Sequence, residues 1–360
     1  MHQRHDLLNK QKGVALIVVM LIVALVMVIA VQMSGRLQLN VARTTNLKAN
    51  NQAYWYALGA EQFAQSSLAQ LKALTGDNIN LSQPWAQPLE YPIEGGVIKA
   101  QLFDMQTCFN LNALNSNSSR NDTQNNDDED SNDETEDNQT NTNTTTNNNK
   151  ATNAYTASQQ AFHRLITQYI NDSLVTDTIR DSLIDWLDSD SVQKNYGAED
   201  SYYESLPRPY LAANNNLSHT SEFRLINGMD EALQQADMRP MQKALCVLPE
   251  NELKINVNTI TEETAMVLSA LLGDDENKGQ DIISARPEEG FADKDRFLNL
   301  PEVSVLNLTA QQQEWFDVTS KYFKLNTTAI FQDSQFRLVT IFKIDNDGVS
   351  IISREFGGAF

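Results

Sequence analysis

Residues 11–31 read QKGVALIVVMLIVALVMVIAV, and this stretch determines how the rest of the chain can be arranged. Gly13 separates a short cationic leader from 18 uncharged and almost wholly apolar residues, 14–31. At about 1.5 Å of rise per residue, a helix over that run would be about 27 Å long, close to the hydrocarbon thickness of a bilayer. We therefore expect one membrane-spanning helix that begins directly after the glycine.

The place of the small residue distinguishes this segment from an ordinary secretory signal, in which small residues follow the apolar stretch. Cleavage after Gly13 would remove the leader, residues 1–13, and leave Val14 at the start of a chain that keeps its membrane helix. This arrangement resembles the signal of type IV pilins and type II secretion pseudopilins. Two alternatives stay open: an uncleaved signal anchor, and a cleaved signal processed at residues 28–30. In each case the leader stays in the cytoplasm and the rest of the chain crosses the membrane.

The helix is expected to continue well beyond the membrane. Residues 32–72 contain no proline, and small or apolar residues recur at helical spacing from Ala53 to Leu71. A helix from Val14 to about Ala73 would be roughly 90 Å long. Its first half would lie in lipid, and its second half would lay one face on a folded domain.

Strand patterns lie on both sides of a helical block. Residues 89–93 and 97–103 indicate a hairpin around residues 94–96, and a two-residue period returns after Phe316. The predicted fold is therefore α+β: a pilin-like long N-terminal helix plus an antiparallel sheet, with a large inserted α-helical domain. The expected C-terminal strands are 322–330, 336–344 and 349–356. Beyond the membrane span, the expected units are 32–114 (helix and first strands), 115–153 (insertion), 154–315 (helical domain) and 316–360 (last strands).

Residues 115–153 are nearly all Asn, Asp, Thr, Ser and Glu, with nine acidic residues from Asp122 to Asp137. Such side chains offer almost no apolar surface to offset the entropy of ordering the chain. We interpret the tract as a disordered surface insertion; a calcium-binding repeat is the alternative, although no fixed spacing recurs. The net charge of the whole chain is −20, which argues against a nucleic-acid partner because phosphates are bound by clustered Lys and Arg.

A series of internal motifs is more specific than the N-terminal signal. In chain order they are GVALI at 13–17, FNLNAL at 109–114, DWLD at 185–188, GAEDSYY at 197–203, RPY at 208–210, NVNT at 256–259 and ARP at 285–287. Together they resemble the minor pseudopilin K of type II secretion systems, also called general secretion pathway protein K. The resemblance covers nearly the whole chain.

This resemblance implies a structural subunit, not an enzyme, of the periplasmic pseudopilus that helps to export folded proteins across the outer membrane. It implies a place at the pseudopilus tip beside minor pseudopilins I and J, where the subunit initiates assembly. It also implies cleavage between Gly13 and Val14 by a prepilin peptidase, with N-methylation of Val14. The mature chain would be a single-pass protein of the inner membrane with its bulk in the periplasm.

The chain has two cysteines, Cys108 and Cys246, and both follow the membrane span. In the oxidising periplasm an even pair is expected to form a disulfide. On the chain-entropy model, closing a loop of more than about a hundred residues contributes on the order of 4–5 kcal/mol to stability. A metal or redox role is not indicated, because the two cysteines are far apart in the sequence.

The most distinctive local chemistry is a group of acidic residues around Gly197. The predicted metal ligands are Asp188, Asp190, Glu199, Asp200 and Glu204. Calcium takes six to eight hard oxygen ligands, and carboxylates that repel each other in a folded loop need such a counter-ion. The first three have the spacing of EF-hand positions one, three and twelve, but Gln193 stands where an EF-hand has glycine. A solvated acidic face is the plain alternative; the resemblance favours a structural Ca²⁺ site, because proteins of the K family bind calcium.

Residues from about 255 to 301 resemble a helix-hairpin-helix motif, a module that often binds DNA phosphates. Its connector, residues 273–279, is acidic and lacks the glycine hairpin whose amides would face a phosphate. We therefore interpret the region as a packing module and expect no nucleic acid. A membrane-anchored DNA-binding protein is the less favoured alternative, and a tip or minor subunit of a type IV pilus is the nearer one.

The fifth residue after the expected processing site is Val18. Most pilin-like proteins have a glutamate there, which pairs with the N-terminal amine of the subunit above. Without a partner, a carboxylate at that depth costs roughly 2.5–3.5 kcal/mol on insertion scales. A topmost subunit has no amine to neutralise, so Val18 favours the tip position. The alternative is an ordinary membrane anchor that never enters a filament.

Overall fold

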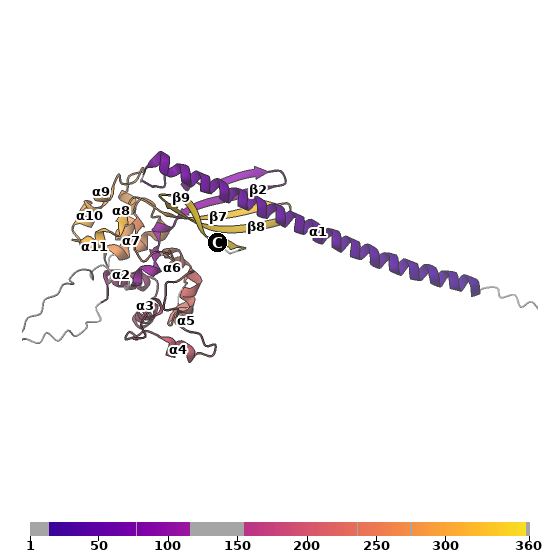
Figure 1. Cartoon of the computed structure of the whole chain (residues 1–360), viewed down its shortest axis with the longest axis horizontal. Helices are drawn as coiled ribbons and strands as arrows, with labels where there is room; N and C mark the ends of the chain where they lie inside the picture. Colours follow the sequence, from indigo (N-terminus) through magenta and orange to yellow (C-terminus); the bar gives the residue numbers. More distant parts are fainter. Residues whose placement is uncertain (1–13, 77, 116–154, 236, 274–275, 358–360) are drawn as a thin grey trace, which may run out of the picture.

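The computed structural model describes residues 14–76, 78–115, 155–235, 237–273 and 276–357 of the chain. Gly13, the rest of the leader and most of the acidic tract lie outside these residues. Figure 1 shows a very long helix, a sheet along the distal part of that helix, and a group of short helices at the far end of the sheet.

The first element is a single helix, α1, which runs from Val14 to Thr75 over 62 residues. At 1.5 Å per residue it is about 93 Å long. Residues 14–48 are exposed along their whole length, and within the described part of the chain α1 is the one helix long and apolar enough to cross a membrane. From Ala49 onward a stripe of α1 is buried, and its small alanines let the helix lie close to the strands. The buried apolar residues of this stripe are Ala49, Ala53, Ala57, Ala60, Ala64, Leu68 and Leu71.

Five antiparallel strands form one sheet in the order β1-β2-β7-β8-β9. They are β1 (Leu89–Ile93), β2 (Gly96–Asp104), β7 (Tyr322–Phe331), β8 (Ser334–Asp345) and β9 (Gly348–Phe356). α1 covers one face, where Leu68 packs with Phe323 and Phe342. The first hairpin requires glycine, because Gly95 has a φ of +83° and a side chain on Gly96 would overlap the backbone of β7. We call α1 and this sheet the body.

Residues 105–319, between β2 and β7, fold into a second unit that we call the head. Its α-helices are α2 (Ala157–Thr167), α3 (Ser173–Leu187), α4 (Asp200–Glu204), α5 (Met229–Gln235), α6 (Arg239–Ala244), α7 (Ala265–Leu272), α8 (Lys278–Ala285), α9 (Lys294–Leu298), α10 (Pro301–Ser304) and α11 (Ala310–Gln313). Two short parallel pairs accompany them: β3 (Phe109–Asn110) with β4 (Leu245–Cys246), and β5 (Ile255–Asn256) with β6 (Phe316–Asp317). Short 3-10 turns lie at Pro84–Ala86, Met105–Thr107, Leu111–Leu114, Thr220–Leu225 and Glu262–Thr264.

The predicted fold class is confirmed by this architecture. The long helix, the hairpin before the head and the three C-terminal strands all lie where the sequence pattern places them. One boundary differs: Phe316 and Asp317 form β6 and pair with β5, so the head continues past residue 315. The predicted C-terminal strands begin at residue 322, and this additional short strand pairs with a strand of the head.

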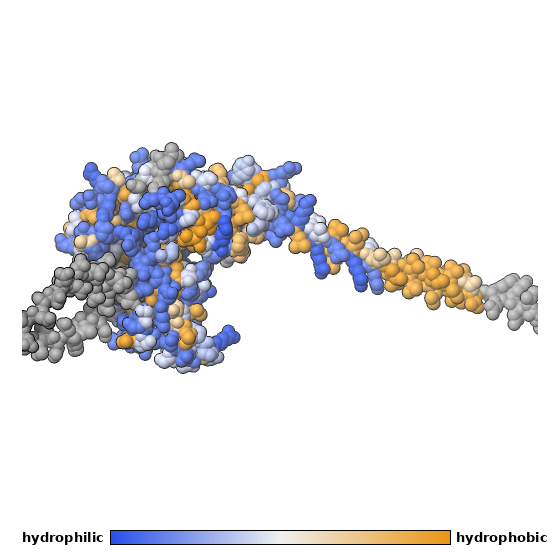
Figure 2. Space-filling view, in the orientation of Figure 1, coloured by the Kyte–Doolittle hydropathy of each residue, from blue (hydrophilic) through white to orange (hydrophobic). Residues whose placement is uncertain are grey.

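The apolar end of α1 and the head lie at opposite ends of the molecule (Figure 1). Figure 2 shows that the apolar end of the helix projects free of the folded units, whose surfaces are mostly hydrophilic. The head has its own hydrophobic core, in which Phe162, Leu183 and Phe297 are fully buried. The head is therefore held at the end of the body farthest from the apolar end of α1 (Figure 1).

Candidate metal centre

The acidic residues predicted as ligands lie around the loop between α3 and α4. Asp188 is the C-cap of α3, Asp190 follows it in the loop, and Glu199 is the N-cap of α4. One carboxylate oxygen from each of these three residues lies within 4.8 Å of the other two. We call Asp188, Asp190 and Glu199 the acidic trio. The loop thus returns on itself and brings together the three acids that have EF-hand spacing.

Most of the buried oxygens of the acidic trio have no donor. Asp188 and Glu199 are buried, whereas Asp190 is exposed. Oδ1 of Asp188 and both carboxylate oxygens of Glu199 make no hydrogen bond within the described part of the chain. Glu199 does not even cap α4 with its side chain, although it stands at the N-cap. A buried carboxylate without donors is costly, and converging carboxylates are the ligands that a hard cation takes.

Burial and mutual repulsion make the acidic trio bind protons more tightly than free carboxylates do. Burial, and then the charge of Asp190, raises the pKa of Asp188 to about 6. Burial, followed by the charges of Asp188 and Asp190, raises the pKa of Glu199 to about 7. The ammonium of Lys194 lies 4.0 Å from Oδ2 of Asp188 and opposes this effect only in part. A bound cation would favour the charged forms and reverse these shifts.

Two buried carboxylates on α3 hold the loop in this shape. Asp185 accepts the backbone N–H of Lys194 on both oxygens, at 3.2 and 3.1 Å. One turn earlier, Asp181 accepts the backbone N–H of Tyr196 at 3.2 Å. Residues 181, 185 and 188 are spaced by four and three, which puts them on one face of the helix. The loop therefore folds along a carboxylate-bearing face of α3.

Two of the five predicted ligands stand apart from the acidic trio. Asp200 is half-buried, and its Oδ1 accepts the backbone N–H of Ala212 at 2.9 Å. Glu204 is exposed at the end of α4. Neither belongs to the group whose oxygens lie within 4.8 Å of one another. Asp200 is therefore better placed to hold the following loop than to bind an ion.

Asp185 and Gly197 also shape the loop. The sequence places Asp185 in the same acidic group, although not among the predicted ligands, and Gly197 at the turn. Burial raises the pKa of Asp185 to about 7, and the charge of Glu199 adds to that shift. A side chain at position 197 would overlap Oδ2 of Asp185, so glycine is required there by close approach. The signal was present in the sequence, since Asp185 lies one turn before Asp188 in a helical pattern. Gln193, at the position where an EF-hand needs glycine, does not have a positive φ.

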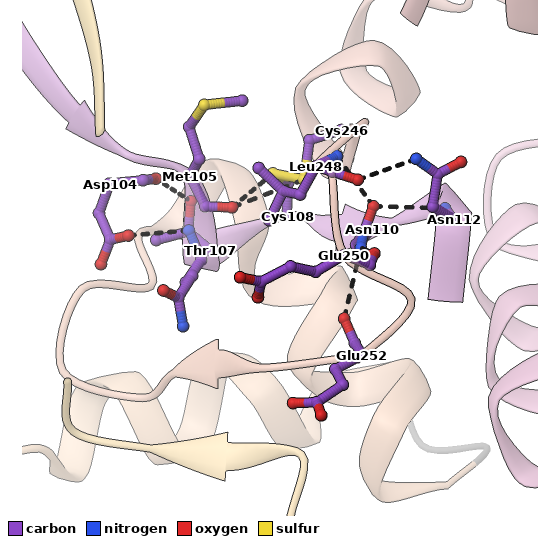
Figure 3. Close-up of a disulfide and its surroundings, with 11 residues drawn as sticks. Asp104, Met105, Thr107, Cys108, Asn110, Asn112, Cys246, Leu248, Glu250 and Glu252 are labelled. Carbon is purple, nitrogen blue, oxygen red and sulfur yellow. Dashed lines mark hydrogen bonds between the residues drawn. A yellow bond between two sulfur atoms is a disulfide. The ribbon is translucent and has the colours of Figure 1, made fainter. Parts of the chain in front are cut away.

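The remaining predicted site residues lie elsewhere. Cys108 and Cys246 are joined in a disulfide that links positions 138 residues apart, close to the junction of head and body (Figure 3). Val14 is the first residue of α1, and Val18 is exposed in its apolar half. Gly13 lies outside the described residues, so the structure does not place the processing site itself.

Comparison with known proteins decides the family. Two models of the family described as type II secretion system protein K match residues 107–250 and 255–319. This chain belongs to the type II secretion system protein K family. Protein K of Aeromonas hydrophila is 33% identical over 97% of this chain and 98% of its own length. Protein K of Dickeya chrysanthemi is 34% identical over 97% of this chain and 98% of its own length.

A solved structure shows the same architecture. A chain of the GspK-GspI-GspJ complex from the type 2 secretion system of enterotoxigenic Escherichia coli is 26% identical, with a TM-score of 0.67. The match covers 88% of this chain and all of that chain. The predicted family is thereby confirmed, and this member of the K family is a minor pseudopilin of the type II secretion system. The family is one of secretion pseudopilins rather than of enzymes, and the alternatives of a pilus subunit or a DNA-binding protein find no support in the comparisons.

Proposed function

We propose that this minor pseudopilin caps the tip of the periplasmic pseudopilus and initiates its assembly. The observation that carries the proposal is the absence of any acidic residue from position 14 to position 60 of α1. Where most pilin-like subunits have a membrane-buried glutamate, this chain has Val18. A subunit without that carboxylate needs no amine from a subunit above it, so the topmost place in the filament is open to it.

The first acidic residue of α1 cannot replace the missing carboxylate. Glu61 is fully buried in the body. It accepts hydrogen bonds from Nε and Nη2 of Arg354, both at 2.8 Å, and from Oγ1 of Thr340 at 2.7 Å. These contacts tie α1 to β8 and β9, and they engage the carboxylate within its own subunit.

The position of the head supports the same conclusion. The head lies beyond the distal end of the sheet, opposite to the apolar end of α1 (Figure 1). In a filament whose subunits stack with parallel α1 helices, the head occupies the space that the next subunit would need. Its bulk therefore limits this chain to the end of a filament.

Minor pseudopilins I and J are the partners that we infer. A structure similar to this chain comes from a complex named for GspK, GspI and GspJ. On this chain, α1 presents large apolar side chains on the side away from the sheet: Trp55 is 64% exposed and Phe63 is 61% exposed. We infer that these exposed aromatic side chains contribute to a contact surface for another protein. The helices of I and J are the occupants expected there.

The membrane placement that we infer follows from α1. Residues 14–31 would anchor the subunit in the inner membrane, with the body and head in the periplasm. A prepilin peptidase would cut between Gly13 and Val14. Mass spectrometry of the mature chain should find N-methylated Val14 as the first residue; an intact Met1 would contradict the inference.

We also infer that the head holds a structural Ca²⁺ ion at the acidic trio. The support is the three buried oxygens that have no donor within the described residues. The ion would neutralise the repulsion between Asp188, Asp190 and Glu199 and join the end of α3 to the start of α4. The ion would therefore stabilise the loop between α3 and α4 of the head.

Gold labelling of sheared pseudopili tests the tip proposal. An antibody against the head should label one end of each filament, while an antibody against the major pseudopilin labels the whole shaft as the matched control. Label from the head antibody along the shaft would contradict a cap.

A further inference from the structure

The head is joined to the body by two neighbouring strand ends. The chain leaves the sheet at Asp104, the last residue of β2, and returns at Tyr322, the first residue of β7. In the sheet register Asp104 lies opposite Phe323, so the two crossings run side by side. Two adjacent strands form a hinge unless further contacts hold the two units together.

On one side of this joint, the buried side chain of Asp104 accepts four hydrogen bonds. Oδ1 accepts the backbone N–H of Gln106 at 2.8 Å. Oδ2 accepts hydrogen bonds from Oγ1 of Thr259 at 2.6 Å, from Nδ2 of Asn256 at 3.3 Å, and from the hydroxyl of Ser320. The carboxylate thus connects the end of β2 to the NVNT turn of the head and to the segment that returns to the body.

The amide of Asn256 extends this network to a third segment. Besides its bond to Asp104, Nδ2 donates to the carbonyl of Ile79 at 3.0 Å and to Oγ of Ser320 at 2.7 Å. Ile79 lies in the loop that follows α1, and its own N–H donates to the carbonyl of Val318 at 2.9 Å. One buried amide therefore contacts the loop after α1, the end of β2 and the approach to β7.

The opposite side of the joint is closed by apolar packing. Met105, Leu248, Tyr322 and the disulfide form one buried cluster. Figure 3 shows the disulfide beside Met105, with Glu250 close by, and the hydroxyl of Tyr322 donates to Oε1 of Glu250 at 2.6 Å. Asp104 and its register partner Phe323 lie on one face of the sheet. Tyr322 comes directly before Phe323 in β7, so it lies on the opposite face, because successive strand residues point to opposite faces. The joint is held from both faces.

We propose that Asp104 and Asn256 are positioning residues that lock this two-strand joint, so that the head keeps one orientation on the body during assembly. In the NVNT turn, which resembles part of a nucleic-acid-binding module, the side chains of Asn256 and Thr259 donate hydrogen bonds to Asp104 inside the joint. The lock is a property of the fold, whereas its use in secretion rests on the proposed tip function. A force applied along α1 would then be transmitted to the head without bending of the joint.

Distance measurements between the two units test the lock. Spin labels carried by unnatural amino acids at exposed Ser66 on α1 and exposed Glu302 on α10 leave the disulfide intact. In the full-length chain in detergent, pulsed electron spin resonance should give one narrow distance distribution. N256D places a second carboxylate against Asp104 and against the carbonyl of Ile79, and it should broaden that distribution. An unchanged narrow distribution in N256D would overturn the proposal.

A paired substitution distinguishes a lock from a general loss of packing. In the double variant D104N/N256D the donor and the acceptor of the shared contact are exchanged, and the hydroxyls of Thr259 and Ser320 can reverse their roles. We expect the double variant to recover part of the narrow distribution that N256D alone loses. N299D makes the same chemical change at an exposed position of the head and should leave the distances unchanged. A double variant as broad as N256D would count against the lock.

Two further measurements keep the test decisive. S320A removes one donor to Asp104 and one acceptor of Asn256 without adding a charge. It therefore serves as a folded variant if N256D unfolds, and it should broaden the distribution by a smaller amount. Secretion of a folded substrate by cells carrying S320A should fall with the broadening. If the distance distribution broadens and secretion does not change, Asp104 and Asn256 still lock the joint, but the lock has no role in assembly. The tip proposal is tested independently, by gold labelling of the filament ends.

Discussion

Two groups of buried carboxylates in this molecule differ in what surrounds them. At the joint, Asp104 accepts hydrogen bonds from four groups. In the loop between α3 and α4, Asp188 and Glu199 have three oxygens without a donor within the described residues. Burial raises the pKa in both places, to about 6 for Asp104 and to about 6 and 7 for the other two. Burial alone therefore does not show what a carboxylate is for, whereas its hydrogen-bond partners do. A carboxylate whose oxygens accept hydrogen bonds connects chain segments, whereas converging carboxylate oxygens without donors are suited to bind a cation.

The largest effect should come from the disulfide, which separates the two regions experimentally. In C108A/C246A the closed loop across 138 residues is lost. On the chain-entropy model this lowers the free energy of unfolding by on the order of 4–5 kcal/mol. Chemical denaturation measures the loss, and the calcium-induced gain in stability should persist because the acidic loop lies outside the joint. A variant that unfolds at the same denaturant concentration as the native chain would contradict the prediction.

Calcium should give the next largest effect, and it should act on the acidic loop alone. An ion that binds only the folded state adds about 2.7 kcal/mol at a hundredfold excess over its dissociation constant. Thermal melting with a chelator and with millimolar calcium measures this gain. D188N/E199Q should abolish most of it, whereas E204Q should retain it, because Glu204 is exposed and stands apart from the acidic trio. An equal loss of the calcium-induced stabilisation in both variants would contradict the assignment of the ligands.

The effect of pH should be smaller and should distinguish the two regions once more. Without calcium, the pKa of Asp185, Asp188 and Glu199 is raised to about 7, 6 and 7. The folded chain then holds more protons than the unfolded chain between about pH 4 and pH 7, so the free energy of unfolding falls as the pH rises through that range. Saturating calcium should remove most of this fall, because the ion favours the charged carboxylates.

A residual slope should remain in saturating calcium. Asp104 also has a raised pKa, and its oxygens are already occupied by donors. Its contribution to the pH dependence of unfolding should therefore be insensitive to calcium. Denaturation curves at pH 5 and pH 7, with and without calcium, measure both parts; a pH dependence that calcium removes completely would show that Asp104 contributes nothing to it.

The body could be predicted from the sequence because its signals are local. The apolar run from Val14, the buried alanine spacing and the period-two strands each depend on neighbours within a few residues. The fold class follows from their order. The sequence predicts the end of the helical insertion at residue 315, because the period of two begins at Phe316. A local pattern does not show that Phe316 and Asp317 pair with a distant strand of the head.

The candidate sites could be predicted only in part. The sequence indicated Asp188, Asp190 and Glu199 by their spacing. It also included Asp200 and Glu204, since spacing says nothing about which way a short helix turns its side chains. The network around Asp104 was not predicted. Its members come from positions 104, 256, 259 and 320, and no local pattern indicates that such distant segments meet.

A calorimetric calcium titration of the full-length chain in detergent, after removal of bound metal, tests the central comparison most directly. At pH 7.5 the native chain should release or absorb saturable heat as calcium binds. D188N/E199Q should lose that heat, whereas D104N, which changes a carboxylate whose oxygens are already satisfied, should keep it. A titration without saturable heat, or one in which D188N/E199Q binds calcium as the native chain does, would contradict the account.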